Sequence, residues 1–275
     1  MVNRAFIEEV GPFRWLLRYG SLHFRKTILK RDSTLRLPTG VRIILPRQSK
    51  NSTEIYVTNA NIDWGAEAIF ARFADLQRDF LDIGSHIGYY ATYLSPCVRR
   101  SYAFEPDVRN HPGLYKNAGL VGNMEVVEMA VSSVDGIADF HGGQGSAVGS
   151  LNNVGGPMTK VRVTTIDTFV ASHEGIDVGL IKTDVEGHDL EALHGMHRTI
   201  AAFQPLILTE CELTTGLSDL CTQWRYSIFA ITRDTATRRS RFMELSASDC
   251  DNLRCKMLFL VPQILKPEFN RLKEN

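Results

Sequence analysis

The sequence of 275 residues lacks any run of about 20 consecutive apolar residues, the length that a membrane-spanning helix needs. Its first residues, MVNRAFIEE, also lack the apolar core of a secretory signal. Hydrophobic residues make up 44% of the chain and charged residues 23%, which is typical of a globular protein. We therefore expect one large cytoplasmic domain with an accessory segment.

Paired cysteine motifs are also missing. No Cys-x-x-Cys occurs, and an odd number of cysteines cannot form a complete disulfide framework. The five cysteines are Cys97, Cys211, Cys221, Cys250 and Cys255. We expect them to be reduced thiols, as is usual in the cytoplasm, and not ligands of zinc.

The net charge is zero, but it is unevenly spread. Residues 1–50 carry eleven Lys and Arg against three Asp and Glu, a net of +8, so the remainder carries −8. Within residues 11–31 the basic side chains accompany an imperfect helical stripe of Phe13, Leu16, Leu17, Tyr19 and Phe24. This segment is either a helix packed on the domain with its cations solvated, or a peripheral contact with the inner face of a membrane or an acidic glycolipid.

From residue 80 onward, short apolar runs alternate with helical patterns, which predicts an α/β fold with a mostly parallel sheet. A β-hairpin is expected before them, around the turn 38–40, and helical residues at 65–76. The expected strands are Phe80–Ile83, Tyr102–Glu105, Val126–Ala130, Leu180–Asp184, Leu206–Glu210, Tyr226–Ile231 and Met257–Val261. The expected helices lie near His86–Leu94, Pro112–Gly119 and Leu190–Phe203. Two segments look like loops: the glycine-rich residues 142–156, and the stretch containing Arg233, Arg238, Arg239 and Arg241.

The strongest local motif is FLDIGSHIGYY at residues 80–90, where a strand leads through Gly84 and Gly88 into a helix. Glycines let the backbone approach a ligand, but the spacing departs from the dinucleotide fingerprint. Asp82 before the turn disfavours a pyrophosphate and suits an ammonium group. Glu105, at the end of the next strand, is placed to accept hydrogen bonds from ribose hydroxyls. S-adenosylmethionine meets both conditions; alternatively, Asp82 caps the turn and Glu105 is a solvated strand end.

With AFEPD, TTIDTF, LIKTDVEGHDLEALHGM, LILTE and the upstream DWGAE, this motif resembles the FkbM-type methyltransferases over roughly residues 35–262. The resemblance implies a seven-stranded class I (Rossmann-like) sheet with helices on both faces, S-adenosylmethionine as methyl donor, and O-methylation, often of sugars. Together with the patterns described above, we expect a basic helix and hairpin at 1–60, a methyltransferase domain at 61–265 and a tail at 266–275; the resemblance does not cover the first 30 residues. The expected cofactor residues are Asp82, Gly84, Ser85, His86, Gly88, Glu105, Glu128, Met129 and Asp184.

The block from Lys182 to His188 follows a strand and is expected at the carboxyl edge of the sheet, where ligands bind. Asp184 is predicted to lie beside the transferring methyl group, and Glu186 and His188 are rival general bases for an acceptor hydroxyl. Lys182 is either catalytic or an ion-pair partner. Glu210, ending the next strand, could join Asp184 and Glu186 around a divalent cation such as Mg²⁺.

Three other functions compete with this prediction. An NAD-dependent oxidoreductase shares the fold class, but Asp82 and the glycine spacing argue against it. A nucleic-acid or amino-group methyltransferase remains possible through the basic N-terminus, although no Asn-Pro-Pro-aromatic turn is present and we expect no nucleic-acid partner. A non-catalytic binding module is disfavoured by the intact carboxylates. The expected acceptor is a small molecule or glycan, facing the glycine-rich or the Arg-rich segment, and the sequence does not define an oligomeric state.

Overall fold

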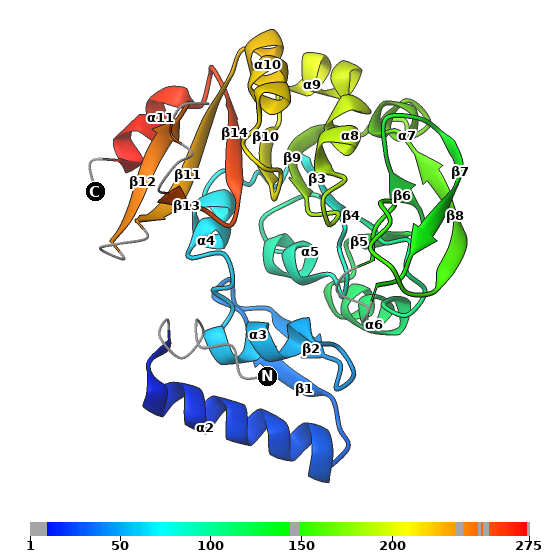
Figure 1. Cartoon of the computed structure of the whole chain (residues 1–275), viewed down its shortest axis with the longest axis vertical. Coiled ribbons are helices and arrows are strands. Elements are labelled where there is room, and N and C mark those ends of the chain that lie inside the picture. Colours follow the sequence, from blue (N-terminus) through cyan, green and yellow to red (C-terminus); the bar gives the residue numbers. More distant parts are fainter. Residues whose placement is uncertain (1–9, 144–148, 235–238, 247–248, 250–252, 274–275) are drawn as a thin grey trace.

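The central sheet has five parallel strands in the order β10-β9-β3-β4-β5, extended by antiparallel strands β14, β11 and β12 beyond β10 (Figure 1). The computed structural model describes residues 10–143, 149–234, 239–246, 249 and 253–273. The parallel strands are β3 (Asp79–Ile83), β4 (Ser101–Phe104), β5 (Met124–Val127), β9 (Val178–Thr183) and β10 (Leu206–Thr209). The antiparallel ones are β11 (Tyr226–Asp234), β12 (Ser240–Leu245), β13 (Leu253–Arg254) and β14 (Leu258–Pro262). The predicted α/β class is confirmed.

The predicted number of strands is corrected from seven to nine in the described part of the sheet. The two additional strands, β12 and β13, both pair with β11 in the segment that we expected to be an exposed loop. Arg233 lies within β11 and Arg241 within β12, whereas Arg238 lies outside the described residues. The long arginine side chains hid this hairpin, because only its partly buried residues, such as Phe242, carry the apolar signal.

Helices cover both faces of the sheet, so side chains that alternate along one strand enter two different cores. In β3, Phe80 belongs to one buried cluster, while Leu81 and Ile83 belong to the other. The helices are α4 (Ala66–Ala71), α5 (Tyr89–Leu94), α6 (His111–Val121), α7 (Ile166–Ala171), α8 (Asp189–His194), α9 (His197–Phe203), α10 (Thr215–Trp224) and α11 (Lys266–Leu272). The last one buries Phe269 in the core.

The single helix expected over 190–203 is two helices, α8 and α9, that separate at Gly195. A Cβ atom on Gly195 would lie 2.1 Å from the carbonyl oxygen of Ser132. The chain therefore passes too closely at this point for any other residue, and the apolar periodicity alone did not reveal the break.

A second sheet of three strands, ordered β6-β8-β7, lies beside α6 and α7 (Figure 1). Its strands are β6 (Ala130–Val131), β7 (Gly136–His141) and β8 (Met158–Thr164). The strand expected at 126–130 is thus divided, since β5 ends at Val127 and Ala130 begins β6. The glycine-rich segment connects β7 to β8, and its residues 144–148 lie outside the described residues.

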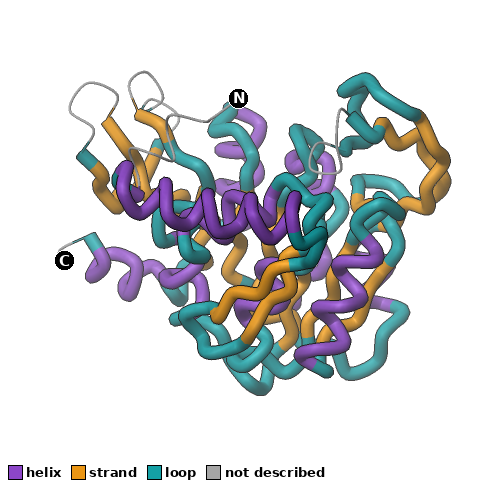
Figure 2. The backbone as a smooth tube through the Cα atoms, turned by 90° about the horizontal axis from the view of Figure 1, so that it is seen from below, coloured by secondary structure: helices purple, strands orange, loops and turns teal. Residues whose placement is uncertain are grey.

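The N-terminal extension packs against one end of the domain (Figures 1 and 2). It contains α2 (Pro12–His23), a π-helical turn η1 (Phe24–Ile28), the expected hairpin β1 (Ser33–Arg36) and β2 (Arg42–Leu45), and α3 (Asn51–Thr58). Arg18 and Lys26 donate hydrogen bonds to Tyr56, Asn59, Ser49 and Thr53 at and around α3. The opposite face of α2 and η1 exposes Phe13, Leu16, Leu17, Phe24 and Ile28. Within the described ranges, none of the helices combines the length and apolar character needed to cross a bilayer.

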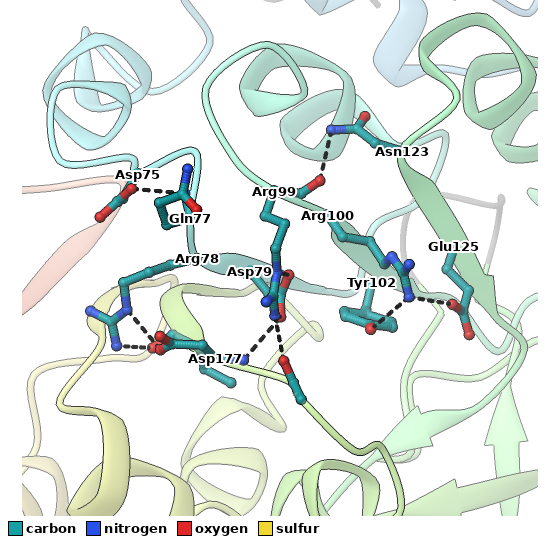
Figure 3. A network of polar contacts seen from close by, with 12 residues as sticks. Asp75, Gln77, Arg78, Asp79, Arg99, Arg100, Tyr102, Asn123, Glu125 and Asp177 are labelled. Atoms are coloured by element: carbon teal, nitrogen blue, oxygen red, sulfur yellow. Dashed lines mark hydrogen bonds and ion pairs between the residues drawn. The ribbon is translucent and has the colours of Figure 1, made fainter.

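A polar network holds the amino ends of β3 and β9 together, at the edge opposite the ligand-binding edge (Figure 3). The buried carboxylate of Asp79 accepts a 2.8 Å hydrogen bond from Nε of Arg99 and a second one from the same guanidinium. The backbone N–H of Asp177 donates to Asp79 as well, at 3.0 Å. Asp79 therefore joins three segments that are distant in sequence.

We predict that Asp79→Asn lowers the free energy of unfolding by about 2 kcal/mol, because charge-assisted hydrogen bonds are lost from a buried group whose partner is partly solvated. Urea denaturation measures this change. Asp75→Asn, at a neighbouring exposed turn, is the matched control and should change stability by less than about 0.5 kcal/mol. The affinity for the expected methyl donor, S-adenosylmethionine, should be unaffected in both variants. Weaker binding of this donor by Asp79→Asn would show that the network also shapes the ligand-binding edge.

Candidate active site

A cleft opens where the carboxyl ends of β3, β4 and β9 meet, as expected for an α/β sheet. Its walls combine the glycine turn, the end of β4, the start of β6 and the segment after β9. The lining residues include Gly84, His86, Glu105, Pro106, Asp107, Met129, Ala130, Asp184, Val185, Glu186 and His188, together with Asn51 of α3, Phe140 of β7 and residues 149–151. The cleft thus joins seven of the predicted site residues that are far apart in the sequence: two from the glycine turn, one after β4, Met129 after β5, and Asp184, Glu186 and His188 after β9.

Gly84 fixes the close approach of two cleft walls. Its φ is +73°, and a Cβ atom there would lie 1.9 Å from the carbonyl oxygen of Asp184. The N–H of Asp184 donates to the carbonyl of Ile83 at 3.1 Å, so the end of β9 is fastened to the end of β3. Only glycine permits this contact, because a side chain would push the Asp184 segment out of the cleft.

Glu105 occupies the position predicted for ribose recognition. Its carboxylate accepts backbone hydrogen bonds from His86 and Asp107, each at 2.8 Å. The side chain is buried, and this burial raises the pKa of Glu105 to about 8. The side chain of Asn110 also hydrogen-bonds to this carboxylate, and its remaining lone pair lets Glu105 accept a hydroxyl hydrogen bond from a ligand in the cleft.

Asp82 and Lys182 lie beneath the cleft and do not line it. Asp82 is fully buried, and its Oδ2 accepts from the N–H of Ala91 at 3.0 Å, in the first turn of α5. Lys182 Nζ lies 3.8 Å from Asp82 and 3.2 Å from Asp184, and donates to the carbonyl of Gly84 at 3.0 Å. The direct contact between Asp82 and a ligand ammonium is therefore corrected to a supporting one, and Lys182 forms the ion-pair alternative.

Two tyrosines that the sequence analysis left unassigned extend this buried network. Tyr90 donates to Asp63 at 2.6 Å, and its ring lies 5.6 Å below Lys182 Nζ. Tyr89 donates to Glu67 at 3.2 Å. The two acids of the DWGAE motif thus hold the glycine turn in place through the tyrosines that follow it, on the side away from the cleft. The sequence contains a signal for this contact, since two tyrosines directly follow Gly88 and two acidic residues lie in the DWGAE motif.

Three carboxyl groups that follow β9 and β10 differ in their state of protonation. Burial alone would raise the pKa of Asp184, but Lys182 and the hydrogen bond from Glu210 together outweigh it, and the pKa is lowered. Burial and the adjacent negative charge of Asp184 raise the pKa of Glu210, which is hydrogen-bonded to Asp184. Partial burial, Asp184 and Asp189 together raise the pKa of Glu186 to about 7. Among these three, Glu186 is the group that exchanges a proton near neutral pH.

His188 is held by neighbours on both ring nitrogens. Nε2 lies 2.9 Å from Oγ of Ser132, and Nδ1 lies 3.3 Å from Oδ1 of Asn152. Ser150 donates to the carbonyl of Glu186 at 2.9 Å. The described part of the glycine-rich segment therefore fastens the 185–188 turn, and His188 contributes to the wall of the cleft while its nitrogens are engaged.

Besides Asp82 and Lys182, four further predicted residues lie outside the cleft. Ser85 and Gly88 face inward beneath the turn, and a Cβ atom on Gly88 would lie 2.8 Å from Leu114. Glu128 turns away and accepts from Tyr115 at 2.8 Å. Glu210 faces a neighbouring groove. The metal hypothesis is not supported, because the described residues contain no group of three His, Cys, Asp or Glu side chains arranged to hold an ion.

A parallel sheet closed by antiparallel strands, with its cleft at the carboxyl ends of the central strands, defines a class I methyltransferase fold. The family described as "Methyltransferase FkbM domain" matches residues 82–230, which is more than half of the chain. The chain belongs to the FkbM methyltransferase family, and the predicted recognition is confirmed. The matched region is a methyltransferase domain, and the family implies S-adenosylmethionine as donor.

The hexuronic acid methyltransferase AglP of Haloferax volcanii is 30% identical over 129 residues, which cover 46% of this chain and 53% of AglP. The chain thus spans about half the length of this curated relative. Among solved structures, the methyltransferase FkbM of Methylobacillus flagellatus is 14% identical with a TM-score of 0.43, over 93% of this chain and 61% of that one. Trm5b of Pyrococcus abyssi is 11% identical with a TM-score of 0.45, over 84% and 56%.

Proposed function

We propose that the protein is an S-adenosylmethionine-dependent O-methyltransferase that acts on a sugar hydroxyl. The observation that carries the proposal is Glu186, a carboxyl group on the cleft wall whose pKa is raised to about 7. Methylation of a neutral alcohol requires a group that removes its proton, and a base with a pKa near the working pH does this best. The 30% identity to a hexuronic acid methyltransferase supports a sugar as the acceptor.

The residues of the cleft fit the proposed donor. Glu105 can receive ribose hydroxyls, and the apolar side chains of Met129 and Phe140 provide a surface for the adenine ring. His86 Nε2 is buried and has no hydrogen-bond partner among the described residues, while burial lowers the pKa of His86 to about 4. This neutral imidazole lines the cleft and leaves one polar atom unsatisfied. When bound, the donor supplies a sulfonium-activated methyl group.

The chain's own residues then position the acceptor and remove its proton. Glu186 accepts the hydroxyl proton, and Asp184 retains its negative charge beside Lys182. This charge favours a cationic sulfonium in the cleft, and it keeps the pKa of Glu186 high enough for proton uptake. Fixed alignment of acceptor and donor supplies the rest of the expected rate enhancement.

Incubation of the purified protein with methyl-labelled donor and two sugars, methyl glucuronoside and methyl glucoside, tests this function. We expect label in an ether product that is stable to mild base, which distinguishes an O-methyl ether from a methyl ester. Transfer to an RNA or an amine control but to neither sugar would contradict the proposal. Donor binding measured by calorimetry in the same preparation confirms that the protein used is competent.

A further inference from the structure

A groove beside the cofactor cleft has no role in the function described so far. It runs between the end of β10, the turn at Trp64 and the strands β11 and β14. Its lining includes Trp64, Glu210, Cys211, Leu213, Arg254 and Lys256. We infer that this groove binds the acceptor, with the sugar ring packed on the indole of Trp64; the inference rests on the proposed function and assigns its acceptor site.

The groove connects to the cofactor cleft through two acidic residues. Glu210 lines the groove and is hydrogen-bonded to Asp184, which lines the cleft. A smaller hollow that contains both Glu186 and Glu210 continues the groove toward the cleft. Glu186 therefore belongs to the cleft and to this hollow. A hydroxyl group of a molecule lying in the groove is directed to the base proposed above.

Trp64 is held in an uncommon conformation. Its φ is +59°, and Gly65 follows with a φ of +98°, so two consecutive residues are left-handed. Bulky residues rarely adopt this conformation, and such strain is concentrated at functional sites. The guanidinium of Arg233 lies 4.2 Å from the indole centroid and Lys256 Nζ lies 5.6 Å from it, so two cations fix the ring, which stays partly exposed.

This combination suits a sugar ring. The face of an indole is electron-rich, and the C–H groups on one face of a pyranose carry partial positive charge, so the two surfaces are complementary. Charged groups of both signs line the groove together with the indole: Glu210, Glu212, Asp249, Arg254 and Lys256. Such a rim offers donors and acceptors to the several hydroxyl groups of a sugar.

Two variants test the assignment. Trp64→Ala should raise the KM for the sugar at least about tenfold, as expected when an aromatic contact in a binding pocket is lost. The affinity for S-adenosylmethionine should stay the same, and Trp64→Phe should recover most of the loss because it retains an aromatic face. Trp224→Phe is the control, since Trp224 lies on α10 and donates to His197 at 3.0 Å. A thermal melt of each variant confirms folding.

Saturation-transfer NMR with methyl glucuronoside and methyl glucoside measures sugar binding without turnover, in the presence of S-adenosylhomocysteine. We expect a saturation-transfer signal in the wild type that is lost in Trp64→Ala and kept in Trp224→Phe. A stronger signal for the glucuronoside than for the glucoside would show that the basic residues of the groove bind the carboxylate of the sugar. If the wild type methylates sugars and Trp64→Ala has an unchanged KM and signal, the groove assignment is wrong and the proposed function stands. If the wild type binds donor but neither binds nor methylates a sugar, both are wrong.

Discussion

Replacement of Glu186 by Gln should lower kcat by about 10²–10⁴-fold, the usual contribution of a general base, with little change in the affinity for S-adenosylmethionine. The amide is close in size to the carboxyl group but cannot take up the hydroxyl proton. Asp184, Asp189 and partial burial raise the pKa of Glu186 to about 7, so the wild-type group is already poised for proton transfer. Steady-state kinetics and calorimetry on the same preparation separate turnover from donor binding.

The pKa of Glu186 also predicts the direction in which kcat changes with pH. A base acts only when ionised, so wild-type kcat should rise as the pH increases through about 7 and fall off below it. Glu186→Gln should lose this dependence together with the rate. Glu191→Gln is the matched control, because Glu191 lies one turn further on and accepts a hydrogen bond from Ser133 at 2.9 Å. If the rise near pH 7 persisted in Glu186→Gln, the base would have to be another residue.

The second large effect is expected at Glu105. At a pH above about 8, where Glu105 is ionised, Glu105→Gln should weaken S-adenosylmethionine binding by about 10–100-fold, because hydrogen bonds to a charged acceptor are worth about 1.5–3 kcal/mol. The neutral side chain should still accept one of the two backbone hydrogen bonds that Glu105 receives from His86 and Asp107. Calorimetry measures the dissociation constant directly.

The raised pKa of Glu105 adds a second measurable consequence. Ribose hydroxyls donate preferentially to the ionised carboxylate, so the wild-type affinity should increase as the pH rises through about 8. Glu105→Gln should remove this dependence. Glu128→Gln is the control, because Glu128 faces Tyr115 and lies outside the cleft. Equal affinities of the Glu105 and Glu128 variants would place the donor elsewhere.

Much of the fold could be predicted from the sequence, because buried parallel strands are short apolar runs bounded by turns. β3 and β9 were found this way, and so was the glycine turn. β12 and β13 were missed, since their exposed arginines conceal a pairing that depends on β11. The small sheet β6-β8-β7 was missed as well, because β6 is two residues long and is defined only by its partner β8.

The candidate site was only partly predictable. Gly84, Glu105 and Asp184 were each predicted to follow the end of a parallel strand, and this placement correctly predicted that they line one cleft. It could not show that Asp82 is held inward by the N–H of Ala91, or that Glu128 turns to Tyr115. The direction in which a side chain points depends on partners from other segments, and sequence spacing carries no information about them.

The sequence by itself determined the α/β class, the glycine turn and the acidic residues at the strand ends, because these follow from local periodicity and backbone freedom. Only the tertiary structure decided which carboxyl group has a pKa near neutrality and where Trp64 lies. Protonation depends on burial and on charges such as Lys182, and the groove is formed by segments more than 100 residues apart. Both are properties of the folded chain, since the groups that produce them meet only after the sheet has formed.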